Sequence, residues 1–134
     1  MSFKLSEFRG VDWIYLSKKH IDSAIILLDN GGDMGIICFH IQQAIEKNLK
    51  GYVLVETGEL MDGHSLISLV NIAADRNPKF IKFKGDCPFL SSFYIEDKYP
   101  SEDPLWVKKS DVEFALNVYN DMNIIIKEEL KDII

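Results

Sequence analysis

The sequence predicts an all-α protein: an up-and-down helical bundle of four long helices plus one short helix, in a single domain over residues 1–134. Apolar residues recur at intervals of three and four along four segments, which is the spacing of amphipathic helices. We find no convincing run of alternating strand residues, no repeat and no internal linker. A hydrophobic fraction of 47% and a charged fraction of 27% are ordinary for one globular domain of 134 residues.

The first helix is predicted over residues 12–29. The segment "NGGD", residues 30–33, ends it, because Gly31 can adopt the left-handed conformation that closes a helix. Asp33 can then cap the next helix, and so short a connection favours antiparallel neighbours. The apolar positions of this helix are Ile14, Ile21, Ala24, Ile25 and Leu28.

The second helix, residues 34–56, carries two separate stripes on a helical wheel. The core stripe consists of Ile41, Ile45, Leu49 and Tyr52. The second stripe mixes polar and small residues, namely His40, Gln43, Ala44, Lys47 and Gly51. A glycine inside a helix costs about 1 kcal/mol relative to alanine, so Gly51 suggests close packing. This stripe meets another subunit, lines a groove or simply faces water, and the sequence alone leaves these alternatives open.

A third helix is expected after "MDGH", with Asp62 as its cap, and it ends before Pro78. Its apolar positions are Leu66, Leu69, Val70 and Ala73. Residues 77–88 are expected to form a loop, residues 88–97 a short helix and residues 98–104 an irregular segment. The last helix should open with a capping box from Ser110 to Glu113. Its apolar stripe is Val112, Ala115, Leu116, Tyr119, Met122, Ile126 and Leu130.

The charge balance argues against duplex DNA as a partner. The formal net charge is −6 and the pI is about 5.0, whereas non-specific duplex binding needs a basic surface. Cys38 and Cys87 lack paired spacing and are expected to be reduced, inert thiols. No apolar run approaches the roughly 20 residues that span a bilayer, and we see no signal peptide. We therefore expect a cytoplasmic protein without membrane contact.

One segment of the second helix resembles a known family. The stretch "FHIQQAIEKNLKGYVLVETGE", followed by "HSL" from His64 and "KYP" from Lys98, is similar to the HEPN domains. In that family a helix with H-x-Q-Q-A-x-E-K-x-L-K is followed by a short loop and H-x-L, and a Tyr-Pro pair precedes the last helix. The resemblance runs from about Val11 to the C-terminus.

The resemblance implies an all-α bundle that is usually a homodimer and was proposed to bind nucleotides. Members often work beside a minimal nucleotidyltransferase, as one half of a two-component or toxin–antitoxin pair. Some branches are metal-independent ribonucleases that use Arg-x(4–6)-His, typically across a dimer interface. Two departures stand out: no histidine follows Arg9 or Arg76 at that spacing, and Lys98 replaces the arginine common before the Tyr-Pro pair. Lysine keeps the charge but lacks the planar fork of arginine.

The candidate nucleotide-binding residues are His40, Gln43, Glu46, Lys47, Lys50, His64, Lys98 and Tyr99. Each has a simpler reading. His40 can be a hydrogen-bonded structural residue, and His64 is favoured as a capping residue over an anion ligand. The lysines can be solvated, and Glu46 with Lys50 can form a surface ion pair one helical turn apart. Tyr99 can fix a loop rather than stack on a base.

No catalytic residues are assigned, because no recognisable catalytic motif is present. Zinc-type ligand spacing is missing, with His20, His40 and His64 far apart in sequence, so no metal is expected. No cofactor is expected beyond a nucleotide ligand. The primary prediction is a non-catalytic HEPN module that binds a nucleotide or a nucleotidyltransferase partner. The alternatives are a ribonuclease toxin with non-standard catalytic residues and a purely structural dimeric protein.

Overall fold

The computed structural model describes residues 5–94 and 107–134. Within these ranges the chain is helical with no β-strand, which confirms the all-α prediction. The α-helices are α1 (Leu5–Asp29), α2 (Met34–Thr57), α3 (Leu66–Arg76), α4 (Cys87–Ser91) and α5 (Lys109–Glu129), and a 3₁₀ helix, η1, spans Pro78–Asp86. Three helices are long, α3 has 11 residues and α4 has 5. No helix of this part of the chain is both long and apolar enough to cross a lipid bilayer.

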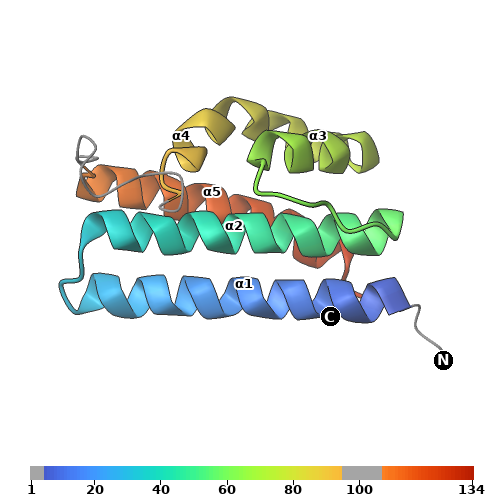
Figure 1. The fold of residues 1–134 in the computed structure, drawn as a ribbon, viewed down its shortest axis with the longest axis horizontal. Helices are drawn as coiled ribbons and strands as arrows, with labels where there is room; N and C mark the ends of the chain where they lie inside the picture. The colour runs from blue at the N-terminus through green and yellow to red at the C-terminus, as the bar shows by residue number, and fades with distance from the viewer. Residues whose placement is uncertain (1–4, 95–106) are drawn as a thin grey trace.

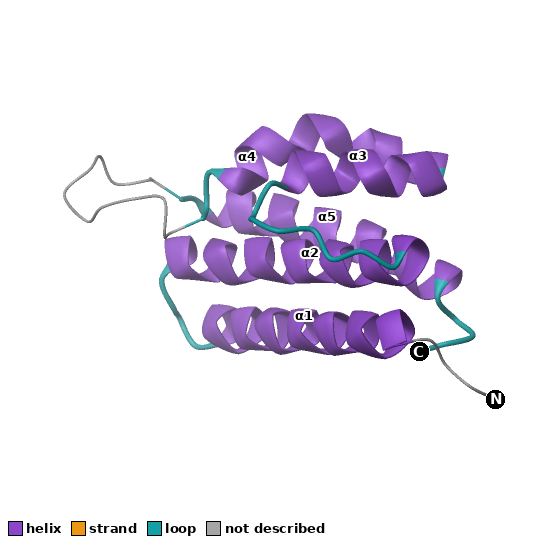
Figure 2. Ribbon diagram, turned by 45° about the vertical axis from the view of Figure 1, so that its right-hand side comes forward, coloured by secondary structure: helices purple, strands orange, loops and turns teal. Residues whose placement is uncertain are grey.

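The helices α1, α2 and α5 lie side by side, and α3, η1 and α4 form a second layer over α2 and α5 (Figure 1). The turn between α1 and α2 is as predicted: Gly31 has a φ of 75°, and the Asp33 carboxylate accepts a hydrogen bond from the Ile36 N–H at 3.0 Å. After α2 ends at Thr57, with Gly58 as its cap, the loop of residues 58–65 runs back along α2 before α3 begins (Figure 2). This return places the end of the loop over the middle of α2.

The predicted core stripes are largely confirmed. On α2 the four core positions are at most 1% exposed, and the predicted positions of α3 and most of those of α5 are also buried. Ile25 of α1 is the exception, because 44% of it is exposed. Cys38 and Cys87 are free, buried thiols, and burial raises their pKa values to about 12 and about 11.

Several predicted boundaries were wrong. The first helix begins at Leu5 rather than residue 12. Ser65, not Asp62 or His64, caps α3, since its side chain accepts a hydrogen bond from the Ser68 N–H. α5 begins one residue before Ser110. In its capping box the Asp111 carboxylate, rather than that of Glu113, accepts a hydrogen bond from the Lys108 N–H at 2.9 Å.

The expected loop over residues 77–88 is also a correction, because most of it forms η1 and α4 begins at Cys87. Phe80 and Phe83 stand three residues apart, which puts them on one side of a 3₁₀ helix. Both are at most 3% exposed, and Phe80 packs on the Tyr52 ring of α2 with centroids 4.9 Å apart. The aromatic anchors therefore hold the segment on the core. Predictions for residues 95–97 and 98–104 lie outside the described residues.

Candidate functional site

Glycines bring α1 against the second stripe of α2. A Cβ atom on Gly51 would lie 2.6 Å from the Gly10 carbonyl oxygen and 2.7 Å from Ile14 Cγ1, both on α1. A Cβ on Gly10 would lie 2.8 Å from the Gly51 carbonyl oxygen. The packing reason inferred for Gly51 therefore exists, and its partner is α1 of the same chain. The reading in which this stripe faces water was wrong, since Gln43, Ala44 and Lys47 are all buried.

Glu46 is the centre of a buried polar cluster. Its side chain is fully buried, and its Oε2 atom lies 2.7 Å from Lys47 Nζ and 3.5 Å from Lys50 Nζ. Nδ1 of His64, at the end of the returning loop, lies 3.0 Å from the same oxygen. Gln42 Nε2 donates to the other carboxylate oxygen at 3.4 Å. The expected ion pair of Glu46 with Lys50 is present, but it is buried rather than on the surface.

These contacts decide the charge of Glu46. Burial acts to raise its pKa, but hydrogen bonds from Lys47 and His64 and the positive charges of Lys47 and Lys50 act in the opposite direction, and the pKa is lowered. Glu46 is therefore an ionised carboxylate at neutral pH. A buried charge is tolerated only when it is paired and hydrogen-bonded, as it is here.

An aromatic wall completes the cluster on the α1 side. The ammonium groups of Lys47 and Lys50 lie 5.6 Å and 5.2 Å from the centre of the Trp13 ring, within the range of cation–π attraction. On the other side, the Tyr94 ring stacks on His64 with centroids 4.6 Å apart. The two lysines are thus held between one carboxylate and one indole.

A histidine pair lies on the same side of the molecule. His20 Nδ1 of α1 and His40 Nδ1 of α2 are 3.1 Å apart, so one ring nitrogen donates a hydrogen bond to the other. Burial lowers the pKa of His20, and so do the nearby His40 and Lys47, while Glu46 acts to raise it. This bond requires that the accepting ring nitrogen carries no proton, so at least one of the two rings is neutral.

The structure brings together most of the candidates found in the sequence. Gln43 joins the cluster through its amide, which donates to the Gln42 oxygen at 2.8 Å. Lys98 and Tyr99 lie outside the described residues. Within those residues, no group of three or more His, Cys, Asp or Glu side chains is arranged to hold a metal ion.

Sequence reasoning missed Trp13 as a site residue and considered His20 only as a zinc ligand. A usable signal was present, because positions seven apart fall on nearly the same stripe of a helix. Trp13 and His20 are spaced in that way and face the polar stripe of α2. Gln42 stands in the quoted H-x-Q-Q pattern but was not taken as a candidate, whereas Tyr94 gave no comparable signal in the sequence.

Comparison with known proteins fits this arrangement. A family model described as the HEPN domain matches residues 11–132. The chain belongs to the HEPN family. Among solved structures, the HEPN chain is similar to the crystal structure of TT1696 from Thermus thermophilus, with 26% sequence identity and a TM-score of 0.73. That similarity covers 91% of this chain and 98% of TT1696. No curated protein gave a match.

The family pattern coincides with the observed cluster. The motif positions that the sequence shares with HEPN domains include His40, Glu46, Lys47 and His64. Three of these, Glu46, Lys47 and His64, are in direct contact, and His40 pairs with His20 nearby. We refer below to Glu46, Lys47, Lys50, His64 and Trp13 as the Glu46 cluster.

Proposed function

We propose that this HEPN domain is a non-catalytic, nucleotide-binding module that works with a separate minimal nucleotidyltransferase. The observation that carries the proposal is the Glu46 cluster, in which two lysines and a histidine surround one carboxylate. The cluster thus has more positive than negative groups, in a chain whose formal net charge is −6. Such a local excess favours an anion.

The lysines can bind a phosphate without leaving Glu46. Each ammonium group has three donors, and the carboxylate accepts from only one or two of them. Both side chains keep a little exposed surface, 11% for Lys47 and 7% for Lys50. Phosphate oxygens would therefore meet the ammonium tips at the surface, beside the Glu46 carboxylate.

A base has a place next to this phosphate position. The His64 side chain is 44% exposed and stacks on the Tyr94 ring on its other side. An exposed imidazole ring backed by an aromatic ring offers a flat surface on which a nucleobase can stack. The resemblance to HEPN domains supports both the nucleotide and the nucleotidyltransferase partner.

The test is thermal unfolding of the purified protein with ATP, GTP, CTP, UTP and AMP, with and without magnesium. A nucleotide at 100 times its dissociation constant should stabilise the fold by about 2.7 kcal/mol. Lys47→Gln should abolish this ligand-induced increase, whatever its effect on the unliganded protein. Lys84→Gln, a change of an exposed lysine on η1, should leave the increase intact.

Two outcomes would contradict the proposal. If no nucleotide stabilises the protein at millimolar concentration, the Glu46 cluster is not a nucleotide site. If the same preparation cleaves single-stranded RNA and His40→Ala abolishes cleavage, the alternative of a ribonuclease with non-standard residues replaces the proposal. Co-purification with a candidate nucleotidyltransferase tests the partnership separately.

A further inference from the structure

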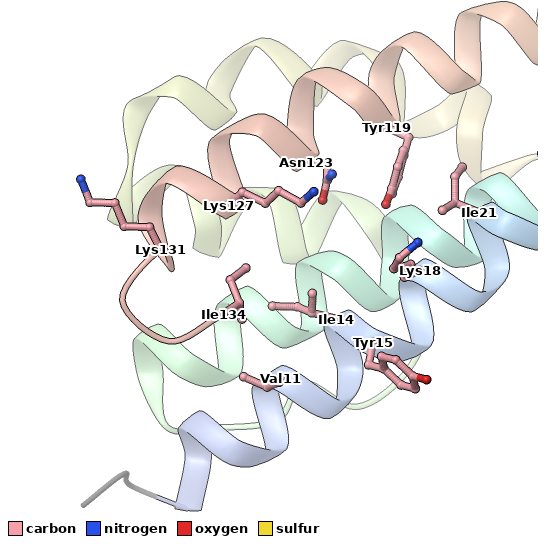
Figure 3. A pocket seen from close by; sticks show the side chains of 10 residues that line it. All are labelled: Val11, Ile14, Tyr15, Lys18, Ile21, Tyr119, Asn123, Lys127, Lys131 and Ile134. Carbon is pink, nitrogen blue, oxygen red and sulfur yellow. The ribbon is translucent and has the colours of Figure 1, made fainter. Parts of the chain in front are cut away.

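A second candidate site lies between α1 and α5, away from the Glu46 cluster. The structure has a groove there with a volume of about 520 Å³, which is within the range of small-molecule sites. Both helices pack against α2. The lining residues are Val11, Ile14, Tyr15, Lys18, Ile21, Tyr119, Asn123, Lys127, Lys131 and Ile134 (Figure 3). None of them belongs to the Glu46 cluster.

The groove is apolar along most of its length. Ile21 and Tyr119, one from each helix, are 6% and 7% exposed and form its inner end. Val11 and Ile14 are half-buried along the α1 wall. From Val11 to Ile21 the α1 wall spans ten residues, or about 15 Å at 1.5 Å per residue. The shape therefore suits an elongated apolar molecule better than a compact polar one.

Three lysines border this apolar surface, and they differ in how they are paired. Lys18 forms an ion pair with Asp22 at 3.1 Å, and Lys131 with Glu128 at 3.7 Å. Lys127 has no ion pair within the described part of the chain, and its side chain extends over the groove beside Asn123 (Figure 3). An unpaired ammonium beside an apolar wall is a place for an anionic head group.

Asn123, which lines the groove, is hydrogen-bonded to an asparagine of α2 whose side-chain oxygen is an unsatisfied buried acceptor. Asn48 of α2 is 1% exposed, and its Nδ2 donates to Asn123 Oδ1 at 3.1 Å. Asn48 Oδ1 has no hydrogen-bond partner among the described residues. Leaving such a group unpaired is unfavourable. Because this acceptor needs a donor, an anionic head group beside Asn123 would reach it only through a bridging water, which can donate to both.

We propose that the α1–α5 groove binds an elongated apolar molecule with an anionic head, such as an acyl chain ending in a carboxylate or a phosphate. The chain lies along Val11, Ile14 and Ile21, and Lys127 binds the head. This site is independent of the proposed nucleotide site, because it uses different residues of α1 and a different helix opposite.

The experiment is calorimetric titration of the protein with decanoate, decyl phosphate and decanol, each below its aggregation concentration. We expect one molecule to bind per chain, and at least one anion to bind more tightly than decanol. Lys127→Gln should weaken anion binding about threefold or more and leave decanol binding unchanged. Lys109→Gln, at the far end of the same helix and outside the groove, is the matched control.

A groove-filling change, Val11→Trp, should abolish binding of all three probes while the unfolding midpoint with AMP still responds as in the parent protein. The proposal is overturned if neither anion binds, if decanol binds as tightly as the anions, or if Lys127→Gln has no more effect than Lys109→Gln. If the probes fail and Val11→Trp dissociates a dimer, a second copy of the chain occupies the groove instead. If Val11→Trp does not fold, the comparison of anion binding between Lys127→Gln and Lys109→Gln still tests the proposal.

Discussion

The lysines on the two sides of α1 differ in burial and in ion pairing. On the side that faces the Glu46 cluster, Lys47 and Lys50 are at most 9% exposed, and both are paired with one carboxylate. On the side that faces α5, Lys127 is exposed and has no ion pair among the described residues. The first site is closed by the protein's own side chains, whereas the second is an open apolar groove with a lysine at its border.

This difference separates the consequences of mutation at the two sites. Groups in the Glu46 cluster satisfy one another, so removing one of them weakens the pairing of a buried charge and acts on stability. The lysine of the groove has no such partner, so its removal acts on binding. A ligand of the Glu46 cluster must bind the ammonium donors that Glu46 leaves free, beside an existing ion pair, while a ligand of the groove meets no ion pair of Lys127.

The largest effect is expected from Glu46→Gln. Glutamine keeps the size of the side chain, but it removes the charge that Lys47 and Lys50 share and replaces one acceptor oxygen by a donor NH₂ group. Breaking a buried ion pair in this way costs about 3 kcal/mol or more. Urea denaturation at neutral pH, followed by circular dichroism, measures the loss in unfolding free energy.

The matched control is Asp22→Asn, which breaks the exposed pair of Asp22 with Lys18 on α1. Surface pairs contribute about 0–1 kcal/mol, so this change should be much milder. Equal losses of unfolding free energy for the two variants would show that the buried ion pairs of Glu46 are no stronger than an exposed pair. The proposed difference between the two sides of α1 would then be wrong.

The next largest effect is expected from Gly51→Ala. The new Cβ would collide with the Gly10 backbone and Ile14, and such overpacking costs about 1–3 kcal/mol. A gain of about 1 kcal/mol in helix propensity offsets part of this cost, so we expect a net loss of up to about 2 kcal/mol. Gly85→Ala, where the Cβ meets nothing within 4 Å, has no such cost, so we expect no loss and a gain of at most about 1 kcal/mol.

Thermal or urea unfolding of both glycine variants checks this prediction. If the second stripe of α2 met another subunit, a larger residue at position 51 would break a dimer. Contact with α1 of the same chain instead predicts a loss that does not depend on protein concentration. A stabilised Gly51→Ala, or a loss that grows on dilution, would count against the intrachain packing.

Local sequence signals predicted the helices well because they depend on near neighbours. The spacing of apolar residues on α2 identified its core stripe, and Gly31 with Asp33 placed the turn before it. The same reasoning failed at residues 77–88, where a proline, a glycine and three lysines hid a 3₁₀ helix anchored by Phe80 and Phe83. Its length of nine residues is unusual for that helix type.

The candidate site could be predicted only in part, since its contacts depend on how distant segments return. A helical wheel gives the direction in which Glu46 points, but not the path of the loop that brings His64 to it. His20 and His40 are 20 residues apart, and only the close packing of α1 on α2 makes them neighbours. The family resemblance grouped His40, Glu46 and His64 without these contacts, because it carries information about the whole fold.

The smallest effect is expected in the pH dependence of stability, and it concerns the polar side of α1. Burial, His40 and Lys47 lower the pKa of His20 from 6.5, so the folded protein binds fewer protons at this site than the unfolded chain. Its contribution to stability is therefore complete above pH 6.5 and is lost as the pH falls below it. The carboxylate of Glu46, whose pKa is also lowered, loses its contribution only below its ordinary value of 4.5.

Urea denaturation at about pH 7.5 and about pH 6 isolates the histidine window, because it stays above the titration of Glu46. We expect the protein to be less stable at the lower pH, and His20→Gln should reduce that difference. Lys84→Gln, an exposed change on η1, leaves His20 and its neighbours unchanged and should preserve the difference. If His20→Gln kept the full difference between the two pH values, protonation of His20 would not be the cause of the lost unfolding free energy. Burial and the neighbouring His40 and Lys47 would then not disfavour the charged form of His20 as the contacts on this side of α1 indicate.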